Sequence, residues 1–189
     1  MITKTLIVRN RYVSLQLLKQ IVIAGIFLLT TTQCAVHKKQ SESGRIEKSA
    51  KVVKKSKNAR ITEAVNYAQQ FIGVSYRYGG KTPETGFDCS GFIAYIYRKV
   101  GINLSPASYQ MAQSGKKVDY GKITKGDLMF FTGSNKNNRV VGHVALVLSN
   151  RSGTIRIIHS TSSRGVVIDT YNSSNYWNER FLFAKRVVL

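Results

Sequence analysis

The sequence predicts an α+β domain in which helices come first along the chain and an antiparallel sheet follows. Two observations indicate this class. Between residues 62 and 113 apolar residues recur at helical spacing, whereas from residue 127 onward they occur in short runs separated by turn residues. Helices segregated from strands in this way are typical of α+β domains rather than of alternating α/β folds.

Three helices are expected in the first part of the domain. The first follows Thr62 and ends at Gly73, with apolar residues at positions 64, 65, 68, 71 and 72. A turn-rich stretch, residues 78–86, separates it from a second helix over residues 89–100. A short third helix is expected over residues 106–113.

The second part of the domain reads as strands joined by turns. The hydrophobic pattern changes here to short runs with turns between them. The predicted strands are residues 127–131, 140–148, 154–160, 166–170 and 181–188.

The formal net charge of +20 is unevenly distributed along the 189 residues. Residues 1–33 carry +4, residues 35–60 carry +7 and residues 61–189 carry +9. Such a charge attracts nucleic acid, anionic lipid or an anionic wall polymer, and charge alone does not choose among them. No aromatic-basic RNA motif, zinc finger or helix-turn-helix pattern accompanies it. We therefore expect no nucleic-acid partner.

Residues 1–33 are predicted to be a signal peptide. Four basic residues precede an unbroken apolar run, Ile21 to Leu29. Nine apolar residues are too few to span a bilayer but suit the apolar region of an export signal. The alternative is a short membrane anchor that is not cleaved.

Cys34 follows this run and resembles the lipidated cysteine of bacterial lipoproteins. The match is imperfect, because Thr31 and Gln33 stand where an aliphatic and a small residue are usual. Lipidation would attach the protein to a membrane without a spanning helix, and ordinary secretion is the alternative. Residues 34–60 are polar and basic, which indicates a flexible tether ahead of a domain at 61–189. The expected location is the cell envelope.

Cys89 is the candidate nucleophile. It lies where a Gly-rich loop enters the second predicted helix, so its thiol is expected to meet the positive end of the helix dipole and free N–H groups. These favour a thiolate and could also bind an oxyanion formed on a substrate carbonyl. The alternative is a buried structural cysteine, which most lone cysteines are.

His143 and His159 are the candidate partners of this thiol. If the turn between their strands is symmetric about Arg151, residues whose numbers add up to 302 face each other, and these two histidines form such a pair. One imidazole could then accept the thiol proton while the other fixes its tautomer. A zinc site made by Cys89, His143 and His159 is an alternative, although the sequence lacks a close ligand pair such as Cys-x-x-Cys.

Five motifs in order resemble those of the NlpC-type cell-wall cysteine peptidases. The match covers residues 61–189 and rests on Tyr78-Gly-Gly, Asp88-Cys-Ser-Gly-Phe92, Gly126-Asp-Leu-Met-Phe-Phe131, Gly142-His-Val-Ala-Leu146 and Ile158-His-Ser160. The resemblance implies a minimal papain-like α+β domain that needs no cofactor.

The same resemblance implies roles for six residues. Cys89 would be the nucleophile, His143 the base and His159 the orienting residue. Tyr78 would line the site beside the thiol, and Asp88 and Ser90 would hold the substrate peptide. The implied substrate is the peptide stem of peptidoglycan, cut between γ-D-glutamate and a diamino acid.

One departure from the family pattern bears on the substrate. Many members have Pro-Arg where this chain has Pro106-Ala107, so one basic contact in the cleft is expected to be missing. Two other functions remain open on sequence alone. One is an amidase or acyltransferase built on the same thiol-imidazole fold, and the other is an inactive, envelope-anchored wall-binding lipoprotein.

Overall fold

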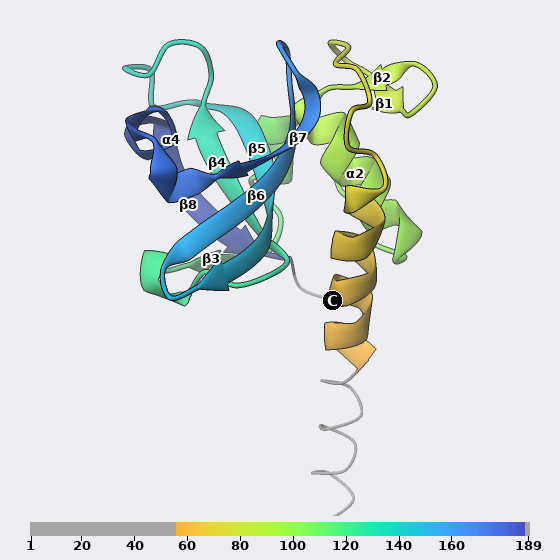
Figure 1. Cartoon of the computed structure of the whole chain (residues 1–189), viewed down its shortest axis with the longest axis horizontal. Coiled ribbons are helices and arrows are strands. Elements are labelled where there is room, and N and C mark those ends of the chain that lie inside the picture. The colour runs from red at the N-terminus through yellow and green to blue at the C-terminus, as the bar shows by residue number, and fades with distance from the viewer. Residues whose placement is uncertain (1–55, 188–189) are drawn as a thin grey trace, which may run out of the picture. The chain divides into compact units, whose positions relative to one another are not determined.

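A six-stranded antiparallel sheet is the centre of the domain in the computed structural model, which describes residues 56–187 (Figure 1). The strand order is β3-β8-β4-β5-β6-β7. The strands are β3 (Lys116–Val118), β4 (Asp127–Thr132), β5 (Val141–Arg151), β6 (Thr154–Thr161), β7 (Gly165–Thr170) and β8 (Phe181–Arg186). The predicted α+β class with an antiparallel sheet is confirmed.

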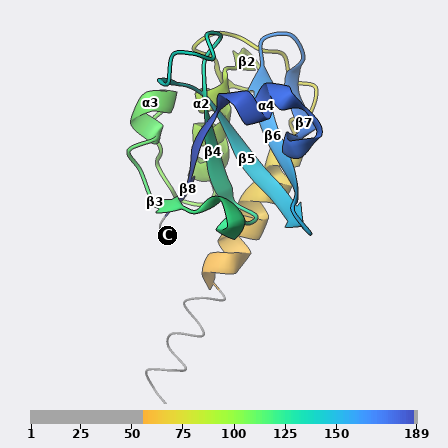
Figure 2. The ribbon, with the colours of Figure 1, turned by 90° about the vertical axis from the view of Figure 1, so that its left-hand side faces the viewer.

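Helices cover one face of this sheet. The first helix runs over residues 56–69, so it begins before Thr62 and before residue 61, where the domain was expected to start. It lies beside α2 (Cys89–Lys99), and a short helix, α3 (Ser108–Met111), follows (Figures 1 and 2). Burial of apolar side chains from these helices against the sheet is the main source of their stability, as for most helices in proteins.

Both faces of the sheet are buried. On β4, Leu128 and Phe130 face the helices, whereas Met129 and Phe131 face a second apolar cluster on the other side. This alternation follows from the two-residue repeat of a strand. The second cluster is covered by short elements that the sequence did not predict, namely η1 (Tyr120–Lys122), η2 (Tyr171–Ser173) and α4 (Asn175–Arg180).

A small hairpin lies ahead of α2. It consists of β1 (Lys81–Thr82) and β2 (Gly86–Phe87), within the stretch predicted to be turn-rich. It leads into α2 through Asp88, so this short stretch fixes where the helix starts.

Among residues 56–187, no helix has both the length and the apolar character needed to cross a bilayer. The predicted signal peptide, Cys34 and nearly all of the predicted tether lie outside the described residues. The exception is residues 56–60, which are helical.

Candidate active site

Cys89 is the first residue of α2, as the sequence predicted. Its partly buried thiol lines a pocket of about 270 Å³ together with Tyr76, His143 and Trp177. The helix begins here because the side chain of Asp88 accepts a hydrogen bond of 2.6 Å from the backbone N–H of Gly91. The thiol is therefore placed by the helix cap.

The side chains of Asp88 and Ser90 form hydrogen bonds with other parts of the chain in this structure. The second carboxylate oxygen of Asp88 accepts a bond of 2.9 Å from the Gly79 N–H, which ties the preceding loop to the helix. The hydroxyl of Ser90 is buried and donates to the carbonyl oxygen of Pro106 at 2.6 Å. These contacts give the two side chains a positioning role, and the substrate contacts that the resemblance implied for them stay a prediction.

Tyr76, not Tyr78, lies beside the thiol. The side chain of Tyr78 is 90% exposed and is not part of the pocket wall, whereas Tyr76 lines it. Tyr76 forms a parallel bridge with Phe87, two residues before Cys89, and this pairing brings it to the site. The assignment of Tyr78 was therefore wrong by two residues.

The two histidines meet, but not through the predicted register. The turn between β5 and β6 is the pair Ser152-Gly153, both with positive φ (50° and 84°), a combination typical of a type I′ hairpin turn. Near the turn Asn150 pairs with Ile155, and further along Val147 pairs with Ile157. The prediction of a turn centred on Arg151, with the histidines directly opposed, was wrong.

A β-bulge explains why the histidines still share a face. Between the pairs Val147–Ile157 and Ser149–Arg156, β5 has one extra residue, Leu148. Without it, the register set by the turn would place His159 opposite Leu146, whose side chain faces the helices. With it, continuing the Val147–Ile157 register places His159 opposite Ala145, on the same face as His143.

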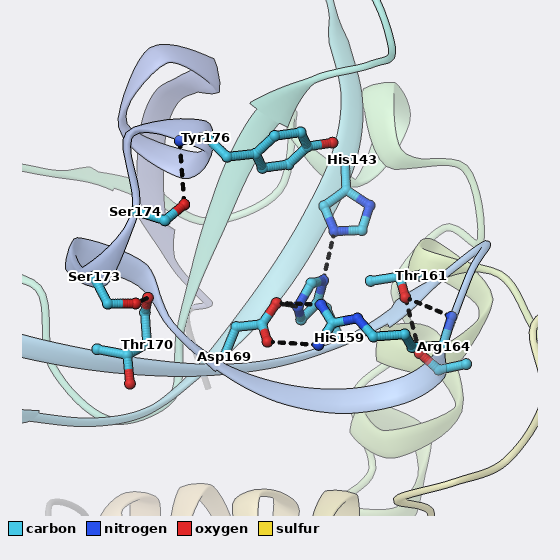
Figure 3. Close-up of polar contacts among 10 residues, drawn as sticks. His143, His159, Thr161, Arg164, Asp169, Thr170, Ser173, Ser174 and Tyr176 are labelled. Atoms are coloured by element: carbon cyan, nitrogen blue, oxygen red, sulfur yellow. Dashed lines mark hydrogen bonds and ion pairs between the residues drawn. The ribbon is translucent and has the colours of Figure 1, made fainter.

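His143 and His159 form a direct hydrogen bond. Nε2 of His143 lies 2.9 Å from Nδ1 of His159 (Figure 3). Trp177 of α4 packs against both rings, nearly parallel to His143 with ring centres 5.6 Å apart and edge-on to His159 at 4.9 Å. The contact leaves Nδ1 of His143 as the ring nitrogen available to the thiol.

The hydrogen-bonded chain extends beyond His159. Nε2 of His159 lies 3.1 Å from a carboxylate oxygen of Asp169 on β7, and Arg164 donates to both oxygens of that carboxylate (Figure 3). These contacts hold the pKa of Asp169 well below its ordinary value. Asp169 and Arg164 were not predicted as site residues.

The electrostatic environment favours neutral forms of the thiol and of His143. Burial of the thiol, followed by the charge of Asp88, raises the pKa of Cys89, and bonds from the backbone of Val144 and Ser90 offset this only in part. Burial and the neighbouring His159 lower the pKa of His143. The helix N-terminus was predicted to favour a thiolate, and this effect is outweighed by burial and Asp88.

Two polar atoms in the pocket wall have no hydrogen-bond partner among the described residues. They are the hydroxyl of Thr132, at the end of β4, and Nε of Arg180, at the end of α4. The Arg180 guanidinium lies over the ring of Tyr176, 3.8 Å from its centre, and donates to the Tyr176 carbonyl at 3.2 Å. Both atoms are shut off from solvent, and buried polar atoms without partners are unfavourable.

The geometry gives the zinc alternative no support. Within residues 56–187 no three His, Cys, Asp or Glu side chains gather as they would around a metal ion. Nε2 of His143 and Nδ1 of His159 face each other, so these two nitrogens are taken by their mutual hydrogen bond.

Several residues of the site had no clear signal in the sequence. Trp177 and Arg180 belong to α4, a six-residue helix that is too short to show a helical repeat. Asp169 lies on a strand with alternating residues, so its carboxylate could have been recognised only if its register opposite Ile157 on β6 had been known.

The comparison with protein families agrees with this geometry. The model described as "NlpC/P60 family" matches residues 73–186. A gamma-DL-glutamyl hydrolase of Bacillus subtilis is 35% identical over 65% of this chain and 29% of its own length. A murein DD-endopeptidase/LD-carboxypeptidase of Escherichia coli, MepS, is 33% identical over 61% of this chain and 57% of its own length.

A solved structure is also similar. The structure of an NlpC/P60 family protein from Bacillus cereus has a TM-score of 0.60 and 32% identity over 68% of this chain and 40% of that chain. The chain therefore spans less than two thirds of the length of each of these three proteins.

We predict that Asp88→Asn lowers the pKa of Cys89, because it removes a negative charge near the thiol while asparagine can still cap the helix. The pH profile of Cys89 alkylation by iodoacetamide, followed by peptide mass spectrometry, should move to lower pH. Asp119→Asn, at an exposed carboxylate, is the matched control and should leave the profile in place. An unchanged or upward-shifted profile in Asp88→Asn would contradict this account.

Proposed function

The chain belongs to the NlpC/P60 family, and from this we propose that it is a cysteine endopeptidase that hydrolyses the peptide stems of peptidoglycan. The observation that supports this proposal best is the convergence of Cys89 and His143 on one pocket, with His143 hydrogen-bonded to His159. The two relatives are named for hydrolysis of γ-glutamyl bonds or of murein peptides. No cofactor is needed for this chemistry.

The first half of the reaction forms an acyl-enzyme. The thiol of Cys89 gives its proton to Nδ1 of His143, and the sulfur attacks the carbonyl carbon of the scissile amide. Backbone N–H groups at the start of α2 are placed to bind the oxyanion. The intermediate collapses, His143 returns the proton to the leaving amine, and the acyl group stays on sulfur.

The second half regenerates the thiol. Water replaces the amine, and His143 takes a proton from it as it attacks the thioester. Collapse releases the carboxylic acid, and the proton returns to sulfur. Because the thiol and His143 are both neutral at rest, proton transfer accompanies attack and is not completed beforehand.

We propose the bond between γ-D-glutamate and the diamino acid as the one that is cut. The relative from B. subtilis is named for γ-glutamyl hydrolysis, whereas the E. coli relative is named for a DD bond. The names of these relatives agree on cleavage of peptide bonds but differ in the position of the bond. An amidase or acyltransferase activity would leave different products.

Arg180 is proposed to bind a carboxylate of the stem peptide. Ala107 stands where many family members have arginine. Arg180, on α4, lines the pocket that holds the Cys89 thiol. Its guanidinium is held in place by Tyr176, so little freedom is lost when it binds.

We also propose that the protein acts in the cell envelope as a lipoprotein anchored at Cys34. This part rests on the basic start, the apolar run and the cysteine in residues 1–34. Residues 35–55 would separate the catalytic domain from the membrane, and their lysines and arginine would favour an anionic surface.

We predict that Cys89→Ser and His143→Ala each remove nearly all hydrolysis of purified peptidoglycan by the full chain. A serine hydroxyl is far less acidic than a thiol, and alanine cannot accept the proton. Mass spectrometry of the wild-type digest should show new γ-D-glutamyl carboxyl and diamino acid amine ends. Free glycan released from intact stems would indicate an amidase, and near-normal turnover by Cys89→Ser would refute the nucleophile.

For Arg180 we predict that Arg180→Met raises KM for stem peptides about tenfold and leaves kcat within about threefold. Methionine keeps an unbranched chain over Tyr176 but lacks the charge that meets the carboxylate. Arg156→Met, at an exposed arginine on β6, is the control and should behave as wild type. A fall in kcat at constant KM would place Arg180 in the chemical step instead.

For Cys34 we predict that Cys34→Ser releases the protein from the membrane fraction, because serine cannot take the thioether-linked lipid. The measurement is the partition of the protein between membrane pellet and supernatant. A mutant that pellets even after a high-salt wash would contradict the lipid anchor and indicate an uncleaved apolar anchor.

A further inference from the structure

His159, the residue expected to orient His143, is itself held by the carboxylate of Asp169, which Arg164 binds in turn. His159 is 0% exposed, and its two ring nitrogens contact His143 at 2.9 Å and Asp169 at 3.1 Å. Arg164 donates two hydrogen bonds to Asp169, at 2.9 and 2.7 Å. The chain of contacts thus runs from the pocket through two imidazoles to the ion pair of Asp169 with the partly exposed Arg164 (Figure 3).

The direction of the hydrogen bonds follows from the carboxylate. An ionised Asp169 can only accept, so Nε2 of His159 must donate. A neutral imidazole carries one ring proton, so Nδ1 of His159 then accepts, and Nε2 of His143 donates to it. Nδ1 of His143 is left with its lone pair, which is the form required of a base for Cys89.

Arg164 keeps this direction from reversing. Its guanidinium balances the negative charge of Asp169, so the carboxylate does not need a protonated, positively charged His159 to balance it. A charged His159 would donate from both nitrogens and would force Nε2 of His143 to accept. The proton of His143 would then sit on Nδ1, and the base would be blocked.

We propose that Asp169, held by Arg164, is a positioning residue that acts through His159 to keep the ring proton of His143 on Nε2. The importance of this tautomer for turnover rests on the proposed function, whereas the tautomer itself is a property of the folded chain. Asp169 acts only through His159 and touches neither the thiol nor the pocket.

The variant that tests this is Asp169→Asn. The amide is nearly isosteric with the carboxylate, but its NH₂ group can donate to Nε2 of His159. Donation at that end reverses each bond in turn and moves the His143 proton to Nδ1. A residue with only a structural role would change stability without moving this proton.

The decisive measurement is ¹⁵N NMR of the histidine rings in the full chain near neutral pH, with His37→Gln used to assign the third histidine. In wild type we expect the His143 proton on Nε2, and in Asp169→Asn on Nδ1. On peptidoglycan stem peptides the variant should lose at least about tenfold in kcat, with KM within about threefold. Asp119→Asn should change neither property.

Two results would overturn the proposal. One is a wild-type spectrum with the His143 proton on Nδ1. This measurement requires neither a folded variant nor a known substrate. The other is an Asp169→Asn protein that folds and keeps the wild-type tautomer, whatever its activity. A wild type that cleaves no stem peptide would refute the proposed function, and the spectra would still decide the tautomer.

Discussion

The carboxylate of Asp88 is the contact on which the arrangement of the site depends. One of its oxygens caps α2 at Gly91, and the other holds the N–H of Gly79. The loop lies so close to the helix that a side chain at position 91 would collide with the carbonyl oxygen of Gly80. The hydroxyl of Ser160 on β6 donates to the carbonyl of Phe87 at 2.8 Å, so the same loop is fixed to the strand that carries His159. The thiol and the imidazoles come from distant parts of the chain, and this loop sets their separation.

Placing the site in a buried position has two opposing effects on its chemistry. Burial strengthens the hydrogen bonds between the imidazoles and from His159 to Asp169, because water does not compete for them. It also disfavours charge on both Cys89 and His143, so the resting pair is neutral. The protein therefore does not rely on a stored thiolate. In the proposed mechanism it relies instead on a base whose lone pair faces the thiol, and on backbone N–H groups that would stabilise charge when it forms.

Sequence reasoning succeeded where the signal was local. The helix at Cys89, five of the six strands of the sheet and its antiparallel pairing followed from the sequence pattern. Cys89, His143 and His159, chosen from residue type and placement, lie near one another: the first two line one pocket, and the two histidines are hydrogen-bonded. It failed where position depends on pairing between distant segments. Tyr76 is brought to the thiol by a bridge to Phe87, and Asp169 reaches His159 only because β7 pairs with β6 in one particular register. The short helix α4, with Trp177 and Arg180, is formed by tertiary packing and has no repeat long enough to detect.

Because of the bulge at Leu148, the face of the sheet on which His143 lies depends on whether the number of β5 residues between it and the turn is odd or even. Successive side chains of a strand point to opposite faces of the sheet. One residue added to or lost from β5 between His143 and the turn would therefore direct the imidazole of His143 to the helix side of the sheet. A change of two residues would restore its orientation while displacing it along the strand. Variation in this hairpin is thus restricted by parity even at its solvent-exposed end, far from any group that takes part in the reaction. Two sequences could share every motif residue and still differ in whether their histidines can meet.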